Sequence, residues 1–237
     1  MEVHSASSIY GRISEGEVKR DMPANLIYSQ ADKAFRQQLR EWTPDIDDIL
    51  ALTEGVVGFC VKSEMPLLAY AARIAPQGAI VELGALQGYT TIVLASIAKQ
   101  RGLRVFSIDD FFEGADPPAS DCPWLPPVSA EIVERNVAPV GADVTVVSGK
   151  SHVVPDGVDE VGLLFIDSDH RGPWLTRELD AWLPLMAPGG VIVLHDYCDD
   201  YPKYAGYVDV INERLGAAPE WEFVTLVRRM IMFRKVK

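Results

Sequence analysis

Five continuous apolar runs constrain the fold more than any other feature of this 237-residue chain. They are "AIVEL", "RVFSI", "VTVVS", "GLLFID" and "GVIVLHD", which lie at 79–83, 104–108, 144–148, 162–167 and 190–196. Strands that are buried on both faces of a parallel sheet give such runs, whereas half-exposed strands alternate polar and apolar residues. Helical patterns separate the runs at 89–102, 129–139 and 174–190. The alternation predicts a doubly wound α/β sheet.

The C-terminal tail follows a different pattern. A helical segment at 204–216 is followed by two strand-like runs within 220–236, joined by a short connection near Arg228. Neighbouring parallel strands need a long crossover, so this short connection indicates an antiparallel pair. We therefore predict a seven-stranded, mostly parallel sheet whose C-terminal part is antiparallel.

Helical patterns also precede the first strand. Residues 29–42, 44–55 and 63–75 each favour a helix, and Ser63 is the expected N-cap of the third. Residues 1–28 are polar and irregular. We divide the chain into 1–62, an arm with helices that cap the site or contact another subunit, and 63–237, the α/β domain.

A long irregular segment at 110–127 interrupts the α/β order. It contains five prolines together with the aromatic residues Phe111, Phe112 and Trp124. Connections of this length in a compact domain are typically functional lids or disordered segments. The aromatic residues favour an ordered lid.

Charge and hydropathy exclude several classes of partner. The net charge of −12 argues against binding to nucleic acid or to an anionic membrane, because both need a basic surface. No apolar run reaches the roughly 18 residues of a membrane span, and the first 25 residues lack the apolar core of a signal peptide. We expect a cytoplasmic protein in which Cys60, Cys122 and Cys198 are free thiols.

Acidic residues end four of the predicted strands. Their positions are Glu82, Asp109, Asp167 and Asp196. A single carboxylate at a strand end is often only a helix cap, but the carboxyl ends of parallel strands meet at one edge. Ligands of open α/β sheets bind at that edge. The four carboxylates therefore indicate a ligand site.

The stretch "ELGALQG" connects the first strand to the next helix. Gly84 and Gly88 let the backbone approach a ligand, but the G-x-G-x-x-G spacing of a dinucleotide turn is absent. Glu82 disfavours a phosphate here and favours a cationic ligand. Asp109 lies 27 residues later, where it can receive ribose hydroxyls. A cationic, ribose-bearing ligand without phosphate matches S-adenosylmethionine. The stretch "SGKS" is no phosphate loop either, because Val144 stands where that loop needs glycine.

Four stretches together carry a resemblance to a known family. "IVELGALQGYTT", "VFSIDDF", "LLFIDSDH" and "LMAPGGVIVLHDY" resemble successive motifs of class I S-adenosylmethionine-dependent methyltransferases, over about residues 60–235. Within that class they look most like metal-dependent O-methyltransferases of natural-product pathways, such as the macrolide sugar type. This resemblance implies a Rossmann-like fold and a small hydroxylated acceptor, such as a sugar, a polyketide or another secondary metabolite. Relatives of this kind often form homo-oligomers.

The resemblance also implies roles for individual residues. The methionine part of the cofactor would lie at Gly84, Ala85, Gly88, Tyr89 and Thr90, with Glu82 beneath; Asp109 would hold the ribose, and Gly149 and Ser151 would lie near the adenine. Asp167 would border the cofactor and, with Asp196, bind a divalent cation, which is usually Mg²⁺. His170 matches the position of a proposed general base.

The chemistry of these residue types is consistent with those roles. A hydroxyl loses its proton as it attacks the sulfonium methyl, and a hard cation on carboxylates lowers the pKa of such a hydroxyl. His170 can accept the proton near neutral pH, although a histidine just past a strand can also be a plain surface residue. The role of His195 stays open: it can be a metal ligand, a substrate contact or a residue turned into the sheet. As a ligand it would suit Mn²⁺, iron or zinc better than Mg²⁺.

Three alternatives to this function stay open. A metal-independent N- or C-methyltransferase would keep the aspartates for structure. A nicotinamide-dependent oxidoreductase could use a similar sheet, although the missing glycine fingerprint argues against it. A non-catalytic homologue would retain the fold alone, because this architecture hosts many functions.

Overall fold

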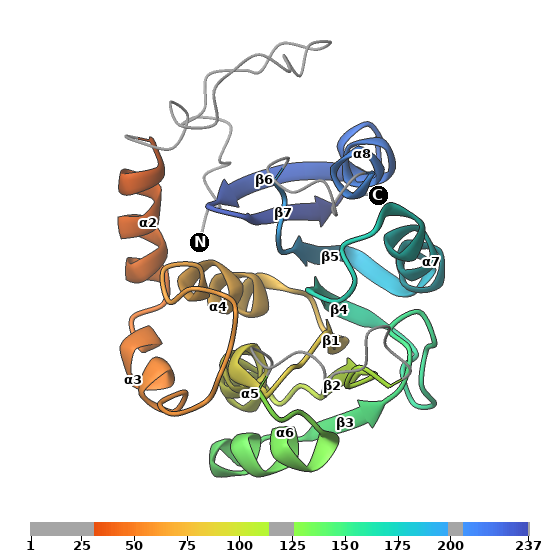
Figure 1. Cartoon of the computed structure of the whole chain (residues 1–237). Coiled ribbons are helices and arrows are strands. Elements are labelled where there is room, and N and C mark those ends of the chain that lie inside the picture. The colour runs from red at the N-terminus through yellow and green to blue at the C-terminus, as the bar shows by residue number, and fades with distance from the viewer. Residues whose placement is uncertain (1–30, 114–125, 199–205, 237) are drawn as a thin grey trace.

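A seven-stranded mixed sheet forms the centre of the protein, as a computed structural model shows (Figure 1). The structure describes residues 31–113, 126–198 and 206–236. The strand order is β3-β2-β1-β4-β5-β7-β6. The bounds are β1 Ala79–Leu83, β2 Val105–Asp109, β3 Val144–Ser148, β4 Val161–Ile166, β5 Met186–Leu194, β6 Trp221–Val227 and β7 Met230–Lys235.

The pairing of the strands confirms the predicted topology. β1 to β5 pair in parallel, while β7 runs antiparallel to both β5 and β6. Only Arg228 and Arg229 separate β6 from β7, and Arg228 adopts a positive φ of 56° in that turn. The order of the strands reverses between β1 and β4. Ligands of doubly wound sheets bind at such a switch point.

Helices cover both faces of the sheet. Within the described ranges, the α-helices with at least five residues are α2 Ala31–Trp42, α3 Ile46–Ala51, α4 Met65–Ile74, α5 Tyr89–Arg101, α6 Ala130–Val137, α7 Gly172–Trp182 and α8 Tyr207–Ile211. A π-helical turn at Asn212–Gly216 follows α8. One buried cluster joins α2 to α6 with one face of the sheet, and a second joins α7 and α8 with the other face. Figure 1 shows α7 and α8 on the side away from α4 and α5.

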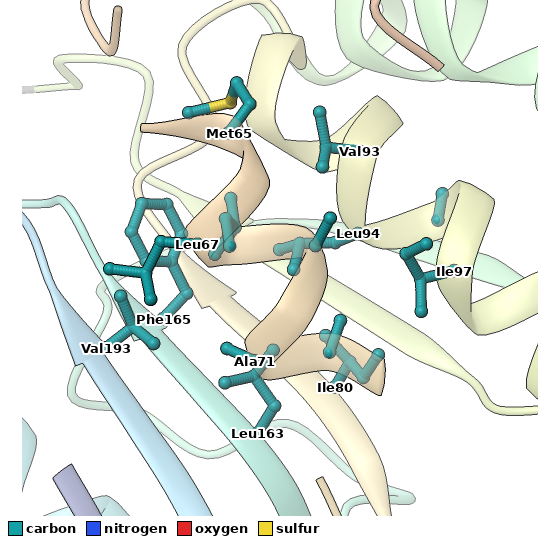
Figure 2. Packing of buried hydrophobic residues seen from close by; sticks show 14 of the residues in the cluster. Met65, Leu67, Ala71, Ile80, Val93, Leu94, Ile97, Leu163, Phe165 and Val193 are labelled. Carbon is teal, nitrogen blue, oxygen red and sulfur yellow. The ribbon is translucent and has the colours of Figure 1, made fainter. Parts of the chain in front are cut away.

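The core between α4, α5 and the sheet is tightly packed. Figure 2 shows Leu67 of α4 beside Phe165 of β4 and Val193 of β5. All three side chains are fully buried. Small residues such as Ala71, at 0% exposure, let α4 lie close to the strands. This packing fixes the position of the first turn of α4, which borders the ligand edge.

The N-terminal helices share this core. Phe35 and Leu39 of α2 and Ile46 of α3 are buried in the same cluster as α4 and α5. The division of the chain at residues 62 and 63 stays a prediction. Residues 1–30 of the predicted arm and residues 114–125 of the predicted lid lie outside the described residues.

Several expected element bounds differ from the structure. The helix expected at 174–190 ends at Trp182, a single 3₁₀ turn follows, and β5 already begins at Met186. Pro184 lacks a backbone N–H and its ring obstructs a continuing helix, so the chain turns into the sheet. The helix expected at 44–55 ends at Ala51. The N-cap of α4 is Glu64 rather than Ser63.

No helix among the described residues is long and apolar enough to cross a membrane.

Candidate active site

A cavity of about 1220 Å³ opens at the carboxyl edge of the parallel strands. Its lining comes from the segment before α4, the glycine turn after β1, the ends of β2, β4 and β5, and the β6–β7 turn. Single ligand pockets commonly measure about 300–1,000 Å³. The cavity is therefore large enough for a cofactor together with an acceptor.

The glycine turn after β1 is held by close backbone packing. Gly84 has a φ of 95°, and a β-carbon there would lie 2.2 Å from the carbonyl oxygen of Asp167. The side chain of Asp109 accepts hydrogen bonds from the backbone N–H groups of Ala85 at 2.8 Å and Leu86 at 2.9 Å. These contacts bring the predicted cofactor turn against the ends of both β2 and β4.

Asp109 is a buried acceptor that organises the cavity wall. Its other oxygen accepts a hydrogen bond from the backbone N–H of Phe111 at 2.7 Å. Burial raises the pKa of Asp109, while these three backbone donors act in the opposite direction. Asp109 lines the cavity. Its predicted role as the ribose acceptor stays a prediction.

Glu82 lies beneath the turn and does not line the cavity. It is fully buried and accepts hydrogen bonds from the hydroxyls of Ser107, at 2.6 Å, and Thr91. Burial raises the pKa of Glu82 to about 7, although the hydroxyl donors favour its ionised form. Glu82 thus supports the turn from below and makes no contact with the cavity.

The start of α5 completes this wall. Gly88 caps the helix with a φ of 90° and packs against Val133, while Tyr89 and Thr90 line the cavity. A β-carbon on Gly58 would lie 2.5 Å from Cβ of Tyr89, so the segment before α4 is in close contact with α5. The predicted residues of the turn are therefore gathered at one wall.

A polar network lies at the predicted adenine end. Ser151 lines the cavity; its hydroxyl accepts a hydrogen bond from Trp174 Nε1 at 2.9 Å and donates one to the buried Glu178. Ser168 also donates to Glu178. Burial raises the pKa of Glu178 to about 7. Gly149 does not line the cavity; its N–H donates to the carbonyl of Asp109 at 2.9 Å, which links the ends of β2 and β3.

Two carboxylates and two imidazoles meet at the other end of the cavity. Nε2 of His170 lies 3.4 Å from Asp167 Oδ1 and 3.6 Å from Asp196 Oδ2. Nδ1 of His195 lies 3.2 Å from Asp167 Oδ1 and 3.6 Å from Asp196 Oδ1. One ligand atom from each of the four side chains lies within 4.8 Å of the others. The structure thus brings the predicted metal residues and the predicted base together.

His195 is the most enclosed of the four, at 5% exposure. Burial alone would lower its pKa, but the carboxylate of Asp167 and its hydrogen-bonding neighbours raise the pKa well above the usual range. Burial alone would raise the pKa of Asp167, but the charge of His195 and hydrogen bonds from both histidines lower that pKa well below the usual range. Without a cation, these two side chains therefore form an ion pair.

These four residues fit a divalent cation. Nδ1 of His195 is buried and lies in ion-pair range of both Asp167 and Asp196. A divalent cation between them would replace the proton of that ion pair, and imidazole nitrogens and carboxylate oxygens are both common metal ligands. Asp167, Asp196 and His195 would be the ligands, and His170 is near enough to be a fourth or to contact the acceptor.

Backbone strain is concentrated around this cavity. Among the described residues, five residues other than glycine have a positive φ: Leu86, Phe111, Phe112, Asp196 and Arg228. All of them except Phe111 line the cavity. Such conformations cost about 1–3 kcal/mol each and cluster at functional sites.

Three further polar residues of the site were not predicted from the sequence. Cys60 donates a hydrogen bond from Sγ to Asp167 Oδ2 at 3.2 Å. Glu64 Oε2 lies 3.2 Å from Nε2 of His195. Glu178 holds Ser151 and Ser168. Glu64 directly precedes the apolar sequence of α4. That position was the one feature of the sequence that indicated a buried carboxylate.

A family comparison identifies the central part of the chain. Residues 81–197 match a family described as a methyltransferase domain. The match begins in β1, includes the glycine turn and ends just past the carboxylate and imidazole group. The chain contains a methyltransferase domain.

Solved structures share the fold of this methyltransferase. The O-methyltransferase NovP is 16% identical with a TM-score of 0.61, and the match covers 87% of this chain and 100% of NovP. The O-methyltransferase TomG of Streptomyces achromogenes, in complex with S-adenosylmethionine, is 18% identical with a TM-score of 0.54, covering 91% of this chain and 100% of TomG. At these identities the likeness establishes the fold.

Proposed function

We propose that the methyltransferase transfers a methyl group to a hydroxyl of a small molecule, assisted by a divalent cation and a histidine base. One observation carries the proposal. The group of Asp167, His170, His195 and Asp196 lies in the same cavity as the glycine turn. A methyl donor on that turn and a hydroxyl at the group would therefore share one enclosed space.

The glycine turn is the proposed site for S-adenosylmethionine, which supplies an electrophilic methyl when bound. TomG carries this cofactor on the same fold. Gly84, Ala85, Tyr89 and Thr90 line that part of the cavity. Asp109 would accept ribose hydroxyls, and Ser151 would lie near the adenine. Gly149 and Glu82 would act indirectly, since neither lines the cavity.

The carboxylate and imidazole group is the proposed cation site. Asp167, His195 and Asp196 would hold the ion; the resemblance of the sequence motifs implies Mg²⁺, with Mn²⁺ or another divalent ion as the alternative. Such an ion would orient the acceptor and lower the pKa of its hydroxyl. Arg229 also faces this group, with Nη1 3.5 Å from Asp196 Oδ1, and adds positive charge at the same edge.

His170 is the proposed general base. Its side chain is about 15% exposed, so the ring is reachable from the cavity. The ring packs edge-on against Tyr207, with centroids 5.2 Å apart, which restricts its orientation. Nε2 faces Asp167 and Asp196, and these carboxylates would stabilise the imidazolium that forms when the ring accepts a proton.

The mouth of the cavity favours an acceptor with an apolar part. Phe59, Val61 and Phe112 are exposed and line the cavity. A sugar-bearing aromatic, a polyketide or another secondary metabolite would offer both a hydroxyl and an apolar surface. One structural neighbour, CalS11, is a TDP-rhamnose 3'-O-methyltransferase of calicheamicin biosynthesis, at 17% identity and a TM-score of 0.51.

The proposal includes assembly and compartment. We propose a homo-oligomer in the cytoplasm, with the N-terminal segment contributing to subunit contacts. Size-exclusion chromatography with light scattering measures the assembly directly. A monomer at all concentrations would remove this part of the proposal and leave the chemistry untouched.

A methyl-transfer assay tests the proposed reaction. The metal-stripped protein is incubated with S-adenosylmethionine labelled in the methyl group and a panel of catechols, phenols and sugar diols. Mg²⁺ or Mn²⁺ is then added back. We expect transfer to at least one hydroxyl that chelator abolishes and metal restores. Transfer that chelator does not change, or transfer to nitrogen or carbon, would favour the metal-independent alternative.

A further inference from the structure

The two ring nitrogens of His195 face different partners. Nδ1 is directed at Asp167, 3.2 Å away, in the proposed cation site. Nε2 lies 3.2 Å from Oε2 of Glu64, on the opposite side of the ring. The carbonyl of His195 also accepts a hydrogen bond from the hydroxyl of the buried Tyr207 at 3.0 Å. The ring is therefore held between Asp167 and Glu64, while Tyr207 of α8 holds the backbone of His195.

Glu64 is itself firmly held. It is 2% exposed and caps the start of α4. Its Oε2 accepts a hydrogen bond from the backbone N–H of Val61 at 3.0 Å, and its Oε1 accepts one from the backbone N–H of Arg229 at 3.3 Å. These two hydrogen bonds fix the orientation of the carboxylate. A carboxylate fixed in this way makes Nε2 the protonated nitrogen and leaves the lone pair of Nδ1 for a metal.

A hydrogen bond from Cys60 orients the other main ligand. Sγ of Cys60 donates to Asp167 Oδ2, so Oδ1 is the oxygen that faces both histidines. Cys60 and Glu64 both come from the segment that precedes β1, outside the matched methyltransferase domain. The segment before the domain thus fixes the orientation of two side chains within it.

We propose that Glu64 is a positioning residue for His195, and that nitrogen ligation by Nδ1 makes the cation site selective for a first-row transition ion, such as Mn²⁺, Co²⁺ or Zn²⁺, over Mg²⁺. Imidazole suits these ions, whereas Mg²⁺ prefers oxygen ligands. Carboxylates that accept a hydrogen bond from a metal-binding histidine fix its tautomer and raise its basicity. The inference rests on the proposed function because it concerns the same cation site.

Metal titrations of the whole chain compare its affinities for Mn²⁺ and Mg²⁺, and they do not depend on catalytic activity. Glu64→Gln keeps the size of the side chain but removes its charge. We expect Glu64→Gln to weaken Mn²⁺ binding by about 10- to 100-fold, and Mg²⁺ binding by less than about threefold. Glu54→Gln, an exposed glutamate of the same segment, is the matched control and should change neither affinity. Equal losses for both ions would show a merely structural role and overturn the proposal.

Spectroscopy of bound Mn²⁺ tests the ligand in the unaltered protein. Pulsed electron paramagnetic resonance should detect coupling to an imidazole nitrogen in the wild-type protein. His195→Asp should abolish that coupling and reduce the Mn²⁺ over Mg²⁺ preference at least about tenfold. Absence of nitrogen coupling in the wild-type protein, or a coupling that persists in His195→Asp, would overturn the proposal.

The outcomes separate this inference from the proposed reaction. An oxygen-only Mn²⁺ site would overturn nitrogen ligation, while metal-dependent methyl transfer could still hold. Metal-independent methyl transfer would overturn the proposed reaction, while nitrogen coupling to bound Mn²⁺ would still support ligation by His195. Failure of every divalent ion to bind would overturn both.

Discussion

Gly84 packs so tightly against Asp167 that a β-carbon on Gly84 would lie 2.2 Å from the carbonyl oxygen of Asp167. This contact joins the ends of β1 and β4 at the switch point of the sheet. The turn proposed to hold the cofactor and the carboxylate proposed to hold the cation therefore share one rigid contact. The glycine is required for packing as well as for ligand approach.

Replacement of Gly84 by alanine should strongly destabilise the protein. The added β-carbon would collide with backbone atoms that cannot move alone, at a φ of 95° that alanine rarely adopts. We expect the free energy of unfolding to fall by at least about 3 kcal/mol. Gly102→Ala is the matched control, because Gly102 has a φ of 67° with nothing within 4 Å of its β-carbon position. That control should cost about 1 kcal/mol. Urea denaturation measures both variants. A similar loss in the free energy of unfolding for Gly84→Ala and Gly102→Ala would contradict the packing argument.

Asp109→Asn should weaken S-adenosylmethionine binding. The carboxylate accepts three backbone hydrogen bonds that shape the cavity wall. Hydrogen bonds to charged groups contribute about 1.5–3 kcal/mol, so we expect the Kd to rise about 10- to 100-fold. Asp143→Asn, in an exposed ion pair with Arg104, is the control. Calorimetric titration measures both variants, and an unchanged Kd for Asp109→Asn would place the cofactor elsewhere.

Glu82 should make the stability of the protein depend on pH. Burial raises the pKa of Glu82 to about 7 from an ordinary value of 4.5. The folded state then binds more protons than the unfolded state between these two values. The stability that protonated Glu82 contributes is fully present below pH 4.5 and is lost as the pH rises through about 7. The free energy of unfolding then falls by roughly 3 kcal/mol.

Glu82→Gln isolates this contribution, since glutamine can still accept the hydroxyl hydrogen bonds but cannot ionise. Glu178, with a similarly raised pKa of about 7, remains in both proteins and cancels in the comparison. We expect wild type to lose stability relative to the variant between pH 5 and pH 8. Chemical denaturation at several pH values measures this, and two parallel curves would show that Glu82 is not the group that titrates.

His170→Ala should lower turnover while leaving the cofactor affinity unchanged. Removal of a general base typically costs about 10²- to 10⁴-fold in rate. Added imidazole should restore part of the rate, because it can accept the proton in the space that the ring leaves. Rate measurements on an acceptor found in the methyl-transfer assay check this. A loss of cation affinity in His170→Ala would instead make His170 a fourth ligand.

Much of the fold could be predicted because its signals are local. The buried runs of β1, β2, β4 and β5 are continuous and apolar, and their carboxyl ends carry Asp109, Asp167 and Asp196 where the topology brings them together. The end of α7 was misplaced because the apolar pattern continues from the helix into β5 without a break. The change from helix to strand there depends on Pro184 and on pairing with β4, which no periodicity shows.

The supporting residues of the site could not be predicted from the sequence. Glu64 is separated from His195 by 131 positions, and Cys60 from Asp167 by 107. Each contact arises only when α4 packs against the sheet. Glu82 shows a related limit. Its place at a strand end suggested contact with a cationic ligand, but its side chain is turned beneath the turn toward Ser107 and Thr91.

Calorimetric titration of the wild-type protein with S-adenosylmethionine, and in parallel with NAD, tests the central claim most directly. We expect saturable binding of S-adenosylmethionine, because the glycine turn and Asp109 line one cavity. The expected Kd is on the order of micromolar, which corresponds to a binding free energy of about −8 kcal/mol. NAD should not bind, because the turn lacks the glycine spacing that accommodates a pyrophosphate. Binding of NAD, or no binding of S-adenosylmethionine with or without divalent metal, would contradict the account.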